Sequence, residues 1–399
     1  MEDLEPGRAL ADTQAGALQH RADAAAAIAL KFADDVDQDA RFPHEALAVL
    51  RAEKLLGVQV PGKLGGEGRT ISETAQVCYT LGRACASTAM IYAMHQTKVA
   101  CIANHGMGSA WHEALLLRLM KEQLLFASST TEGQGGGNVR SSAAPIVHDG
   151  AAISLTRDAS VISYGAEADG VVTTARRSET AEPSDQVLAV FLKEDYELVP
   201  TVGWDTLGMR GTCSSGFNLK ARGVASQIIP VPYDRIHAHT MTPVAHLLWS
   251  SVWAGVAAAG VAKAEAFVRR ALRGSGGQLP PGATHLNKAK SSLRLLRNLI
   301  SSSLALYEKS RADDRYSNSL DFQVSLTLTK VDASELAVET VLSCYRTCGL
   351  AGYRNDGEMS ISRHLRDVLS SPIMINNERI VANMSNSLLM SGVPATLSG

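Results

Sequence analysis

The residue pattern of this chain changes twice, and those changes constrain its fold more than any other feature. Through residues 1–125 apolar side chains recur at spacings of three and four, the pattern of amphipathic helices; Ile71, Ala75 and Cys78 begin one such series. From 126 to 236, glycine, serine and threonine are frequent and short β-branched runs appear, which predicts a compact antiparallel β domain. Helical spacing returns over 237–399. We therefore predict an α+β chain in which a β domain lies between two helical domains. The expected strands include Ala152–Leu155, Val161–Ser163, Gly170–Thr174 and Val187–Leu192.

Composition excludes several classes of function. The 399 residues are 45% hydrophobic and 20% charged with a net charge of −2, which is typical of a globular protein and gives no electrostatic support for nucleic-acid binding. The six scattered cysteines contain no CxxC pair, so buried thiols in a reduced cytoplasm are expected rather than a metal site or disulfides. No apolar run is expected to reach the roughly 18 residues of a membrane span; Leu247–Val261 comes closest. The acidic N-terminus does not resemble a secretory signal, so the cytoplasm is the expected location.

Short motifs occur along nearly the whole chain. They are Phe42-Pro43, Leu55–Pro61 followed by Gly65, Gly66 and Gly68, Thr131-Glu132 with the glycines at 135–137, Leu155–Asp169, Leu207–Thr212, Cys348–Tyr353 and Arg363–Asp367. In order and spacing these motifs resemble those of the acyl-CoA dehydrogenase flavoproteins. The resemblance implies an N-terminal helical bundle over 1–125, a middle antiparallel β-barrel domain over 126–236 and a C-terminal four-helix bundle over 237–399.

The same resemblance implies an FAD site. Small residues in the glycine-rich stretch suit a flavin because they let backbone amides approach the ring and the phosphates. Val161 stands where the family has a tryptophan over the ring, which leaves room beside it. Arg346 and Arg273 stand at the family's cross-subunit cofactor positions, so a homodimer or homotetramer is expected. The full set of expected cofactor contacts is Thr131, Gly136, Gly137, Val161, Ile162, Ser163, Arg273, Arg346, Gly349, Ile375 and Asn377.

The family's catalytic glutamate is missing. Ile375 stands in its place, and the segment Leu247–Trp253, where some relatives carry the base, contains no carboxylate either. A side chain without a proton-accepting group cannot act as a general base, and the loss of such a base costs on the order of 10²–10⁴-fold in rate. Plain desaturation of an acyl-CoA is therefore disfavoured.

The resemblance extends to family members without this glutamate, which include oxygenases that form a flavin–oxygen adduct, among them the oxygenase of bacterial tropone pathways. We therefore expect a flavin-dependent oxygenase that acts on an aromatic or alicyclic acyl-CoA thioester with molecular oxygen and, if one is needed, a flavin reductase or other electron partner. Ser163, Asn376 and Asn377 would supply hydrogen bonds to the reacting groups.

Four further side chains are expected around the substrate, and two other functions stay open. The expected pocket residues are His95, Arg210, Trp249 and Trp253. His95 is equally consistent with a packed helix histidine, and Arg210 with an anchor between the β domain and the helices. One alternative function is an acyl-CoA dehydrogenase in which Glu378, one helical turn beyond Ile375, acts as a relocated base. The other is a flavin-binding subunit without catalytic activity.

Overall fold

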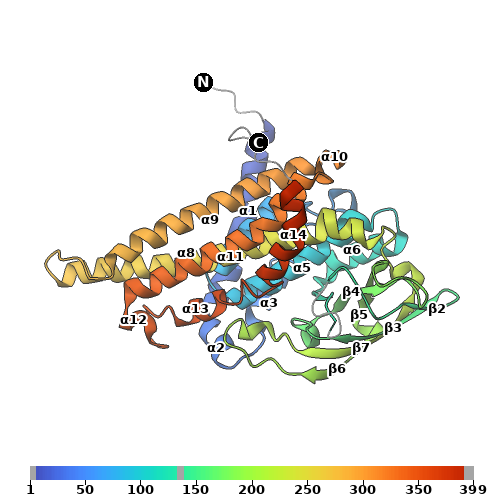
Figure 1. The fold of residues 1–399 in the computed structure, drawn as a ribbon, viewed down its shortest axis with the longest axis horizontal. Helices are drawn as coiled ribbons and strands as arrows, with labels where there is room; N and C mark the ends of the chain where they lie inside the picture. The colour runs from blue at the N-terminus through green and yellow to red at the C-terminus, as the bar shows by residue number, and fades with distance from the viewer. Residues whose placement is uncertain (1–5, 133–138, 391–399) are drawn as a thin grey trace.

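The computed structural model describes residues 6–132 and 139–390, and it has the predicted order of helices, sheets and helices. Of the N-terminal helices, α6 (Ala110–Glu122) lies beside the sheets (Figure 1). The start of α4 (Ile71–Gly82) illustrates how local sequence sets the helix boundaries, because Thr70 and Glu73 cap each other's backbone amides. The N-terminal helices are α1 (Pro6–Lys31), α2 (Ala33–Gln38), α3 (His44–Ala52), α4 (Ile71–Gly82), α5 (Ala86–His105) and α6 (Ala110–Glu122).

The middle part contains two sheets rather than the single antiparallel barrel that we expected. One sheet has the strand order β1-β4-β5, and β1 runs parallel to β4; the other has the antiparallel order β2-β3-β7-β6. The expected strand Val161–Ser163 is a turn, because Tyr164 adopts a left-handed backbone conformation there with φ of 44°. The strands are β1 (Phe126–Ser129), β2 (Val147–Asp149), β3 (Ala152–Ala159), β4 (Gly170–Arg176), β5 (Gln186–Leu192), β6 (Tyr196–Val202) and β7 (Gly216–Val224).

The C-terminal part is dominated by three long helices, α8, α9 and α11, which lie side by side (Figure 1). The helical segments here are α7 (Tyr233–Ile236), a π-helical turn (His237–Met241), α8 (Thr242–Gly274), α9 (Ala283–Ser310), α10 (Asp314–Ser317), α11 (Leu320–Cys348), α12 (Leu350–Tyr353), α13 (Ser362–Val368) and α14 (Asn377–Met390). By length and apolar composition the continuous stretch Tyr233–Gly274 could cross a membrane, contrary to the expectation from sequence. However, 83% of its most apolar window is buried inside the protein, as in the central helix of a globular core.

Two glycines allow the N-terminal helices to contact α8 at close range. A Cβ atom on Gly82 of α4 would lie 2.5 Å from the carbonyl oxygen of Val252, and one on Gly255 of α8 would lie 2.4 Å from that of Tyr79. Real Cβ atoms do not approach a carbonyl so closely, so only glycine fits at both positions. The crossing fixes α4 and α5 against α8, and the core is continuous across the two helical parts.

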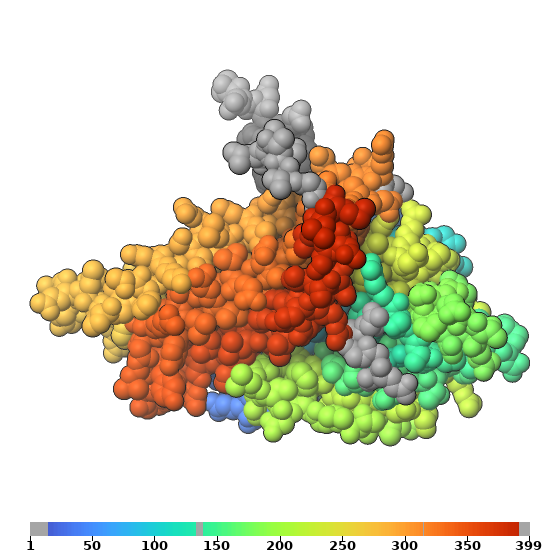
Figure 2. Space-filling model, in the orientation of Figure 1, coloured from blue at the N-terminus to red at the C-terminus, as the bar shows by residue number. Residues whose placement is uncertain are grey.

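Helix α14 crosses the front of the molecule beside the junction between the long helices and the sheets (Figure 2). Its first turn is capped by Asn376, whose side-chain oxygen accepts a hydrogen bond from the backbone amide of Arg379 at 3.0 Å. The segment that leads into α14 contains Ile375, so this arrangement brings the position of the missing glutamate to the junction of helices and sheets.

Candidate functional site

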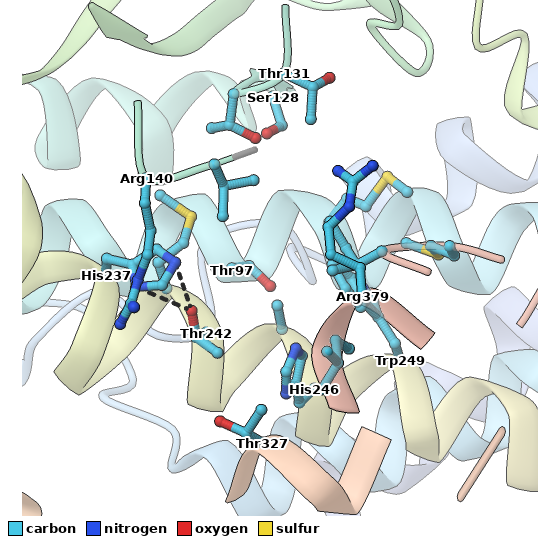
Figure 3. Close-up of a pocket in the computed structure, with 18 of the residues that line it drawn as sticks. Thr97, Ser128, Thr131, Arg140, His237, Thr242, His246, Trp249, Thr327 and Arg379 are labelled. Carbon is cyan, nitrogen blue, oxygen red and sulfur yellow. Dashed lines mark hydrogen bonds between the residues drawn. The ribbon is translucent and has the colours of Figure 1, made fainter. Parts of the chain in front are cut away.

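A cavity of about 750 Å³ lies at this junction (Figure 3). Its walls come from the loop after β1, the turn at Val161–Ser163, helix α5, the first turns of α8, the start of α11 and the segment 370–387. Four of the sequence-predicted cofactor residues line it, namely Thr131, Val161, Ser163 and Ile375, and so does Trp249 from the predicted substrate pocket. The structure therefore brings together residues that lie up to about 240 positions apart in the chain.

The charged side chains among the described lining residues of this cavity are all basic. Lys98, Arg140 and Arg379 line it together with His237 and His246, and none of the described residues that line it is an aspartate or glutamate. Burial lowers the pKa of His246 to about 3, so this imidazole is neutral at pH 7. Much of the remaining wall is apolar and includes several methionine side chains. The cavity offers hydrogen-bond donors and positive charge, but its described walls contain no carboxylate that could remove a proton.

Ser163 is held by a short chain of hydroxyl groups. The hydroxyl of Ser214 donates to Ser163 Oγ at 2.8 Å, and Ser214 Oγ in turn lies 2.8 Å from Thr212 Oγ1. This arrangement occupies one acceptor site of the Ser163 oxygen and leaves its own proton available to a ligand. Val161 is 37% exposed and borders the open space, whereas the neighbouring Ile162 is completely buried in the core. Ile162 was a predicted flavin contact, but its side chain belongs to the core and does not line the cavity.

The loop that carries Thr131 is held by a buried ion pair. Glu132 lies 3.2 Å from the guanidinium of Arg157, and its carboxylate also accepts hydrogen bonds from the hydroxyl of Ser142 and from the backbone amides of Ala143 and Ala144. These contacts leave Thr131 facing the cavity. The predicted contacts Gly136 and Gly137 fall outside the described residues.

Ile375 lines the cavity in a left-handed backbone conformation with φ of 47°, which is costly for a β-branched residue. The buried ammonium group of Lys330 supports it by donating a hydrogen bond to the Ile375 carbonyl oxygen at 3.0 Å. Lys330 also donates to the side-chain oxygen of Asn377 at 2.7 Å, while the amide nitrogen of Asn377 donates to Ser334 and Glu335. Asn377 is therefore a structural residue behind the cavity wall.

Asn376 and Glu378 face away from this cavity. Both are exposed, neither lines it, and Asn376 caps α14. The structure thus differs from the prediction that Asn376 and Asn377 act on the reacting groups, because the side chain of the first caps a helix and that of the second is consumed by internal hydrogen bonds.

His95 and Trp253 belong to the core rather than to the predicted substrate pocket. Both are buried and neither lines the cavity. His95 Nδ1 accepts a hydrogen bond from the backbone amide of Phe126 at 3.0 Å, so Nε2 carries the proton and donates to the carbonyl of Leu56 at 2.9 Å. Burial lowers the pKa of His95 to about 4 and keeps it neutral. Its role is to tie α5 to β1.

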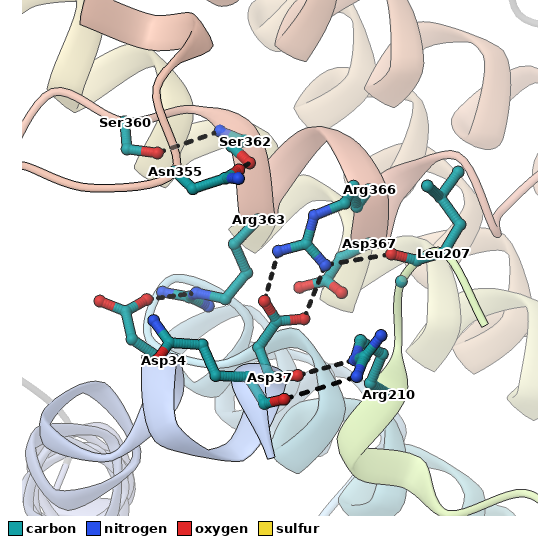
Figure 4. Close-up of polar contacts among 12 residues, drawn as sticks. Asp34, Asp37, Leu207, Arg210, Asn355, Ser360, Ser362, Arg363, Arg366 and Asp367 are labelled. Atoms are coloured by element: carbon teal, nitrogen blue, oxygen red, sulfur yellow. Dashed lines mark hydrogen bonds and ion pairs between the residues drawn. The ribbon is translucent and has the colours of Figure 1, made fainter. Parts of the chain in front are cut away.

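Arg210 belongs to a group of polar contacts that joins α2, α13 and the segment 207–212 (Figure 4). We call these contacts, made by Asp37, Arg210, Arg366 and Asp367, the polar latch. The guanidinium of Arg210 donates to the carbonyl oxygen of Asp37 at 2.8 Å. The carboxylate of Asp37 forms an ion pair with Arg366, and the carboxylate of Asp367 accepts a hydrogen bond from the Met209 amide at 2.7 Å. Arg210 thus anchors the sheets to the helices instead of lining the cavity.

The predicted contacts Arg273, Arg346 and Gly349 lie at the opposite end of the long helices, where α8 turns into α9 and α11 ends (Figure 1). Within one chain they are separate from the cavity. Arg346 and Gly349 are exposed there. Arg273 lines a shallow surface pocket together with Arg269 and Arg270.

Sequence reasoning missed the basic side of the cavity. Lys98 carried a detectable signal, because it is the one Lys, Arg, Asp or Glu in the otherwise apolar or neutral helix Ala86–His105. Arg140, Tyr233, His237, His246 and Arg379 had no such signal, because they come from separate loops and helix ends that only the fold brings together.

Comparisons with known proteins agree with this architecture. Residues 13–121 match the model of the acyl-CoA dehydrogenase N-terminal domain. No curated protein sequence matches the chain significantly. Among solved structures, FMN-bound TdsC from Paenibacillus sp. A11-2, a dibenzothiophene monooxygenase, superposes with a TM-score of 0.80 at 16% identity, over 95% of this chain and 98% of that one.

Two further structures share the fold. Nitrososynthase from Micromonospora carbonacea var. africana has a TM-score of 0.77 at 21% identity and covers 98% of both chains. Butyryl-CoA dehydrogenase from Megasphaera elsdenii has a TM-score of 0.76 at 16% identity, over 94% of this chain and 98% of its own. Residues 13–121 are thus similar to an acyl-CoA dehydrogenase N-terminal domain, and the chain has the acyl-CoA dehydrogenase-like fold over 94% of its length.

Proposed function

We propose that the cavity binds a flavin and that the protein is a flavin-dependent monooxygenase of an acyl-CoA-like thioester with an aromatic or alicyclic acyl group. The observation that carries this proposal is the absence of any aspartate or glutamate from the described cavity lining. Removal of the α-proton of an acyl thioester needs a base, and the two lining histidines are poor ones because burial lowers the pKa of His237 to about 4 and that of His246 to about 3. Oxygen transfer needs instead a shielded cavity with neutral hydrogen-bond donors, and this cavity has that character.

The lining residues suit a flavin ring. Thr131 and Ser163 present hydroxyl groups, and the indole Nε1 of Trp249 is a buried donor with no hydrogen-bond partner among the described residues. Such donors match the carbonyl oxygens and ring nitrogens of an isoalloxazine. Val161 in place of a large aromatic residue leaves space beside the ring, and Ile375 adds an apolar side chain to the lining.

When bound and reduced, the flavin would supply two electrons to molecular oxygen, so that one oxygen atom enters the substrate and the other leaves as water. The residues of the chain have the tasks of positioning the substrate and excluding water. Ser163 keeps a hydroxyl proton directed to the ligand, and the apolar walls exclude bulk solvent. An external flavin reductase would return the cofactor to its reduced form. TdsC, which binds FMN and is a monooxygenase, shares the fold and supports this type of chemistry.

The relocated-base alternative has less support. Glu378 is exposed and does not line the cavity, so its carboxylate would have to move to reach a bound substrate. The other alternative is a flavin-binding subunit without catalytic activity. Such a subunit would bind the flavin, and added substrates would not change the rate at which the reduced flavin reacts with oxygen.

We propose FAD rather than FMN as the flavin, held at the junction of two subunits in a homodimer or homotetramer. Arg269, Arg270 and Arg273 line one surface pocket at the end of the long helices together with Glu358, which lies 4.0 Å from Arg270, and the exposed Arg346 lies near the same end. Guanidinium groups bind phosphates through several N–H donors in a fixed fork, so this end of a neighbouring chain suits the diphosphate of FAD.

Titration of the purified protein with FAD and with FMN tests the cofactor. We expect Arg346→Ala to weaken FAD binding about tenfold and to leave FMN binding unchanged, because only FAD extends to the diphosphate end. Arg297→Ala, on the exposed face of α9, is the matched control. Anaerobic mixing of the oxidised holoprotein with cyclohexanecarbonyl-CoA and with butyryl-CoA, which both carry an α-proton, then tests the reaction class. The flavin absorbance should persist, and its bleaching would assign a dehydrogenase.

A further inference from the structure

One end of the cavity gathers four side chains that sequence reasoning did not single out. Lys98 comes from α5, Tyr233 from α7, His237 from the π-helical turn and Arg140 from the segment before β2. Figure 3 shows Arg140 beside His237 and Thr242, on the side of the cavity opposite Arg379. We call Lys98, Arg140, Tyr233 and His237 the cationic end of the cavity.

Lys98 is a buried cation with a weak partner. The residue is only 3% exposed, and its ammonium group contacts the sulfur of Met241 at 2.8 Å. A thioether is a poor hydrogen-bond acceptor, and it carries no charge to balance the ammonium group. Burial lowers the pKa of Lys98 to about 8, so the group is still largely protonated at pH 7. A buried charge of this kind is costly unless an anion accompanies it.

Tyr233 presents an unused donor at the same end. The residue is 2% exposed, and its hydroxyl has no hydrogen-bond partner among the described residues. Its ring packs edge-on against His237 with 5.7 Å between the ring centroids. Buried hydroxyl groups in native proteins nearly always have a partner, so an unpaired hydroxyl in a cavity wall indicates a ligand atom.

The positive charges of Arg140 and Lys98 both act on the ring of His237. Its ring lies 3.1 Å from the hydroxyl of Thr242. Burial and the charges of Arg140 and Lys98 lower the pKa of His237 to about 4, so both cations are near enough to repel an added proton. The charges that influence His237 are positive, and the described lining contributes no carboxylate to offset them.

We propose that the cationic end binds a carboxylate or phosphate group carried by the substrate, with Lys98 and Tyr233 donating directly to its oxygens. An anion there would accept the unused hydroxyl proton of Tyr233 and balance the ammonium charge of Lys98. The remaining walls, with Met90, Met94 and Trp249, suit an apolar body. The part of the substrate held inside the cavity is therefore largely apolar and carries one anionic group. This inference rests on the proposed function only in assigning the anion to the molecule that is oxygenated.

The test compares matched probes on the full chain, with and without flavin. Benzoate and phenyl phosphate carry the anionic group, and benzamide is a neutral molecule of similar shape. Binding is measured calorimetrically and through the fluorescence of Trp204 and Trp249, which line the cavity. We expect at least one of the anions to bind about tenfold or more tightly than benzamide. Whichever anion binds identifies the group as carboxylate or phosphate.

Three variants test which side chains cause the preference for the anion over benzamide. Tyr233→Phe removes only the hydroxyl, and Lys98→Met keeps the length of the side chain without its charge; each should remove most of the preference for the anion. Lys288→Met, which deletes one positive charge on the exposed face of α9, should leave the preference intact. If Lys98→Met does not fold, the probe comparison and Tyr233→Phe still decide.

Two results would overturn the proposal. One is equal binding of benzamide and both anions by the unaltered protein. The other is a loss of FAD and FMN affinity in Tyr233→Phe and Lys98→Met with benzoate and phenyl phosphate binding unchanged, because that assigns the cationic end to a phosphate of the cofactor. Failure of the proposed function is a separate result: a chain that binds no flavin and still prefers the anion contradicts the flavin site but supports the anion site.

Discussion

The ammonium group of Lys330 and the side-chain oxygen of Asn377 are joined by a hydrogen bond of 2.7 Å. Lys330 is fully buried in α11, and the same ammonium group holds the carbonyl of Ile375. Lys330 therefore positions the wall segment in which an isoleucine stands at the place of the family's glutamate. The cavity wall without a base is an ordered, hydrogen-bonded structure.

Replacement of this lysine should change both stability and its pH dependence. Lys330→Met leaves the oxygens of Ile375 and Asn377 without their donor, which should cost roughly 1–3 kcal/mol of unfolding free energy. Burial lowers the pKa of Lys330 to about 8 from its usual 10.5, so the unfolded chain binds more protons between these values. The contribution of Lys330 to the unfolding free energy should therefore rise from pH 8 to 10.5. Lys98 has a similarly lowered pKa, so the effect of Lys330 is measured as a difference between variants. Denaturant titrations should show that the stability gap between the unaltered protein and Lys330→Met widens over this range, whereas the gap to the exposed Lys121→Met stays constant. A constant gap for both variants would contradict the burial of Lys330.

The latch between α2 and α13 predicts a second loss of stability. Arg366→Ala leaves the carboxylate of Asp37 buried without its ion-pair partner. The expected cost is roughly 2–4 kcal/mol, somewhat below that of breaking a fully buried pair because the Arg366 side chain is 28% exposed. Chemical denaturation measures the loss. Arg354→Ala, which breaks a fully exposed pair with Asp356, is the control and should change stability little. Equal effects of the two substitutions would show that the latch contributes no more than a surface pair.

The close helix crossing gives a prediction with an internal control on α8. Gly255→Ala places a methyl group against the Tyr79 carbonyl and should destabilise the protein by roughly 1–3 kcal/mol. Gly260→Ala meets nothing nearer than the Cys344 sulfur at 3.6 Å, so it should be neutral or slightly stabilising because alanine is the better helix former. Thermal unfolding of both variants checks the difference. A Gly255→Ala variant as stable as Gly260→Ala would mean that α4 and α8 can separate at no cost.

The space beside Val161 is expected to be required for oxygen transfer. Val161→Trp restores the bulk that the family carries and should lower the rate of oxygen-dependent turnover roughly tenfold or more by displacing the substrate. Flavin affinity should change little, since the hydroxyl groups of Thr131 and Ser163 are untouched. Val161→Leu adds less volume and should retain most activity. Turnover and flavin titration together check this. Full activity of the tryptophan variant would show that the space has no role.

Glu378 provides the test of the relocated base. Because Glu378 is exposed and does not line the cavity, Glu378→Gln should keep the turnover rate within about twofold. Loss of a true general base would reduce the rate on the order of 10²–10⁴-fold. Steady-state kinetics of this one variant therefore shows whether Glu378 acts as a general base.

The sequence motifs predicted the fold and part of the candidate site. Thr131, Val161, Ser163 and Ile375 line the cavity because each lies in a motif with a fixed local geometry. The anchoring role of Arg210 was one of two interpretations from the sequence, but its partner Asp37 lies 173 positions away and could not be named. The structural role of Asn377 could not be predicted, because its partner Lys330 lies 47 positions away along the chain.

The strand pairing and the basic residues of the site could not be predicted for the same reason. The parallel pairing of β1 with β4 depends on long-range register, and β-branched residues at 161–162 did not prevent a turn that the left-handed Tyr164 completes. His237 and Tyr233 become site residues only because the π-helical turn packs beside α5 and α7 packs against that turn.

Oxygen isotope labelling distinguishes oxygen transfer from desaturation. The holoprotein is reduced, supplied with ¹⁸O₂ and offered aromatic and alicyclic acyl-CoA thioesters together with their free acids, and the products are analysed by mass spectrometry. We expect a product that contains one labelled oxygen atom, formed only when oxygen is present. An unlabelled α,β-unsaturated thioester, formed without oxygen as the flavin becomes reduced, would assign the protein as a dehydrogenase instead.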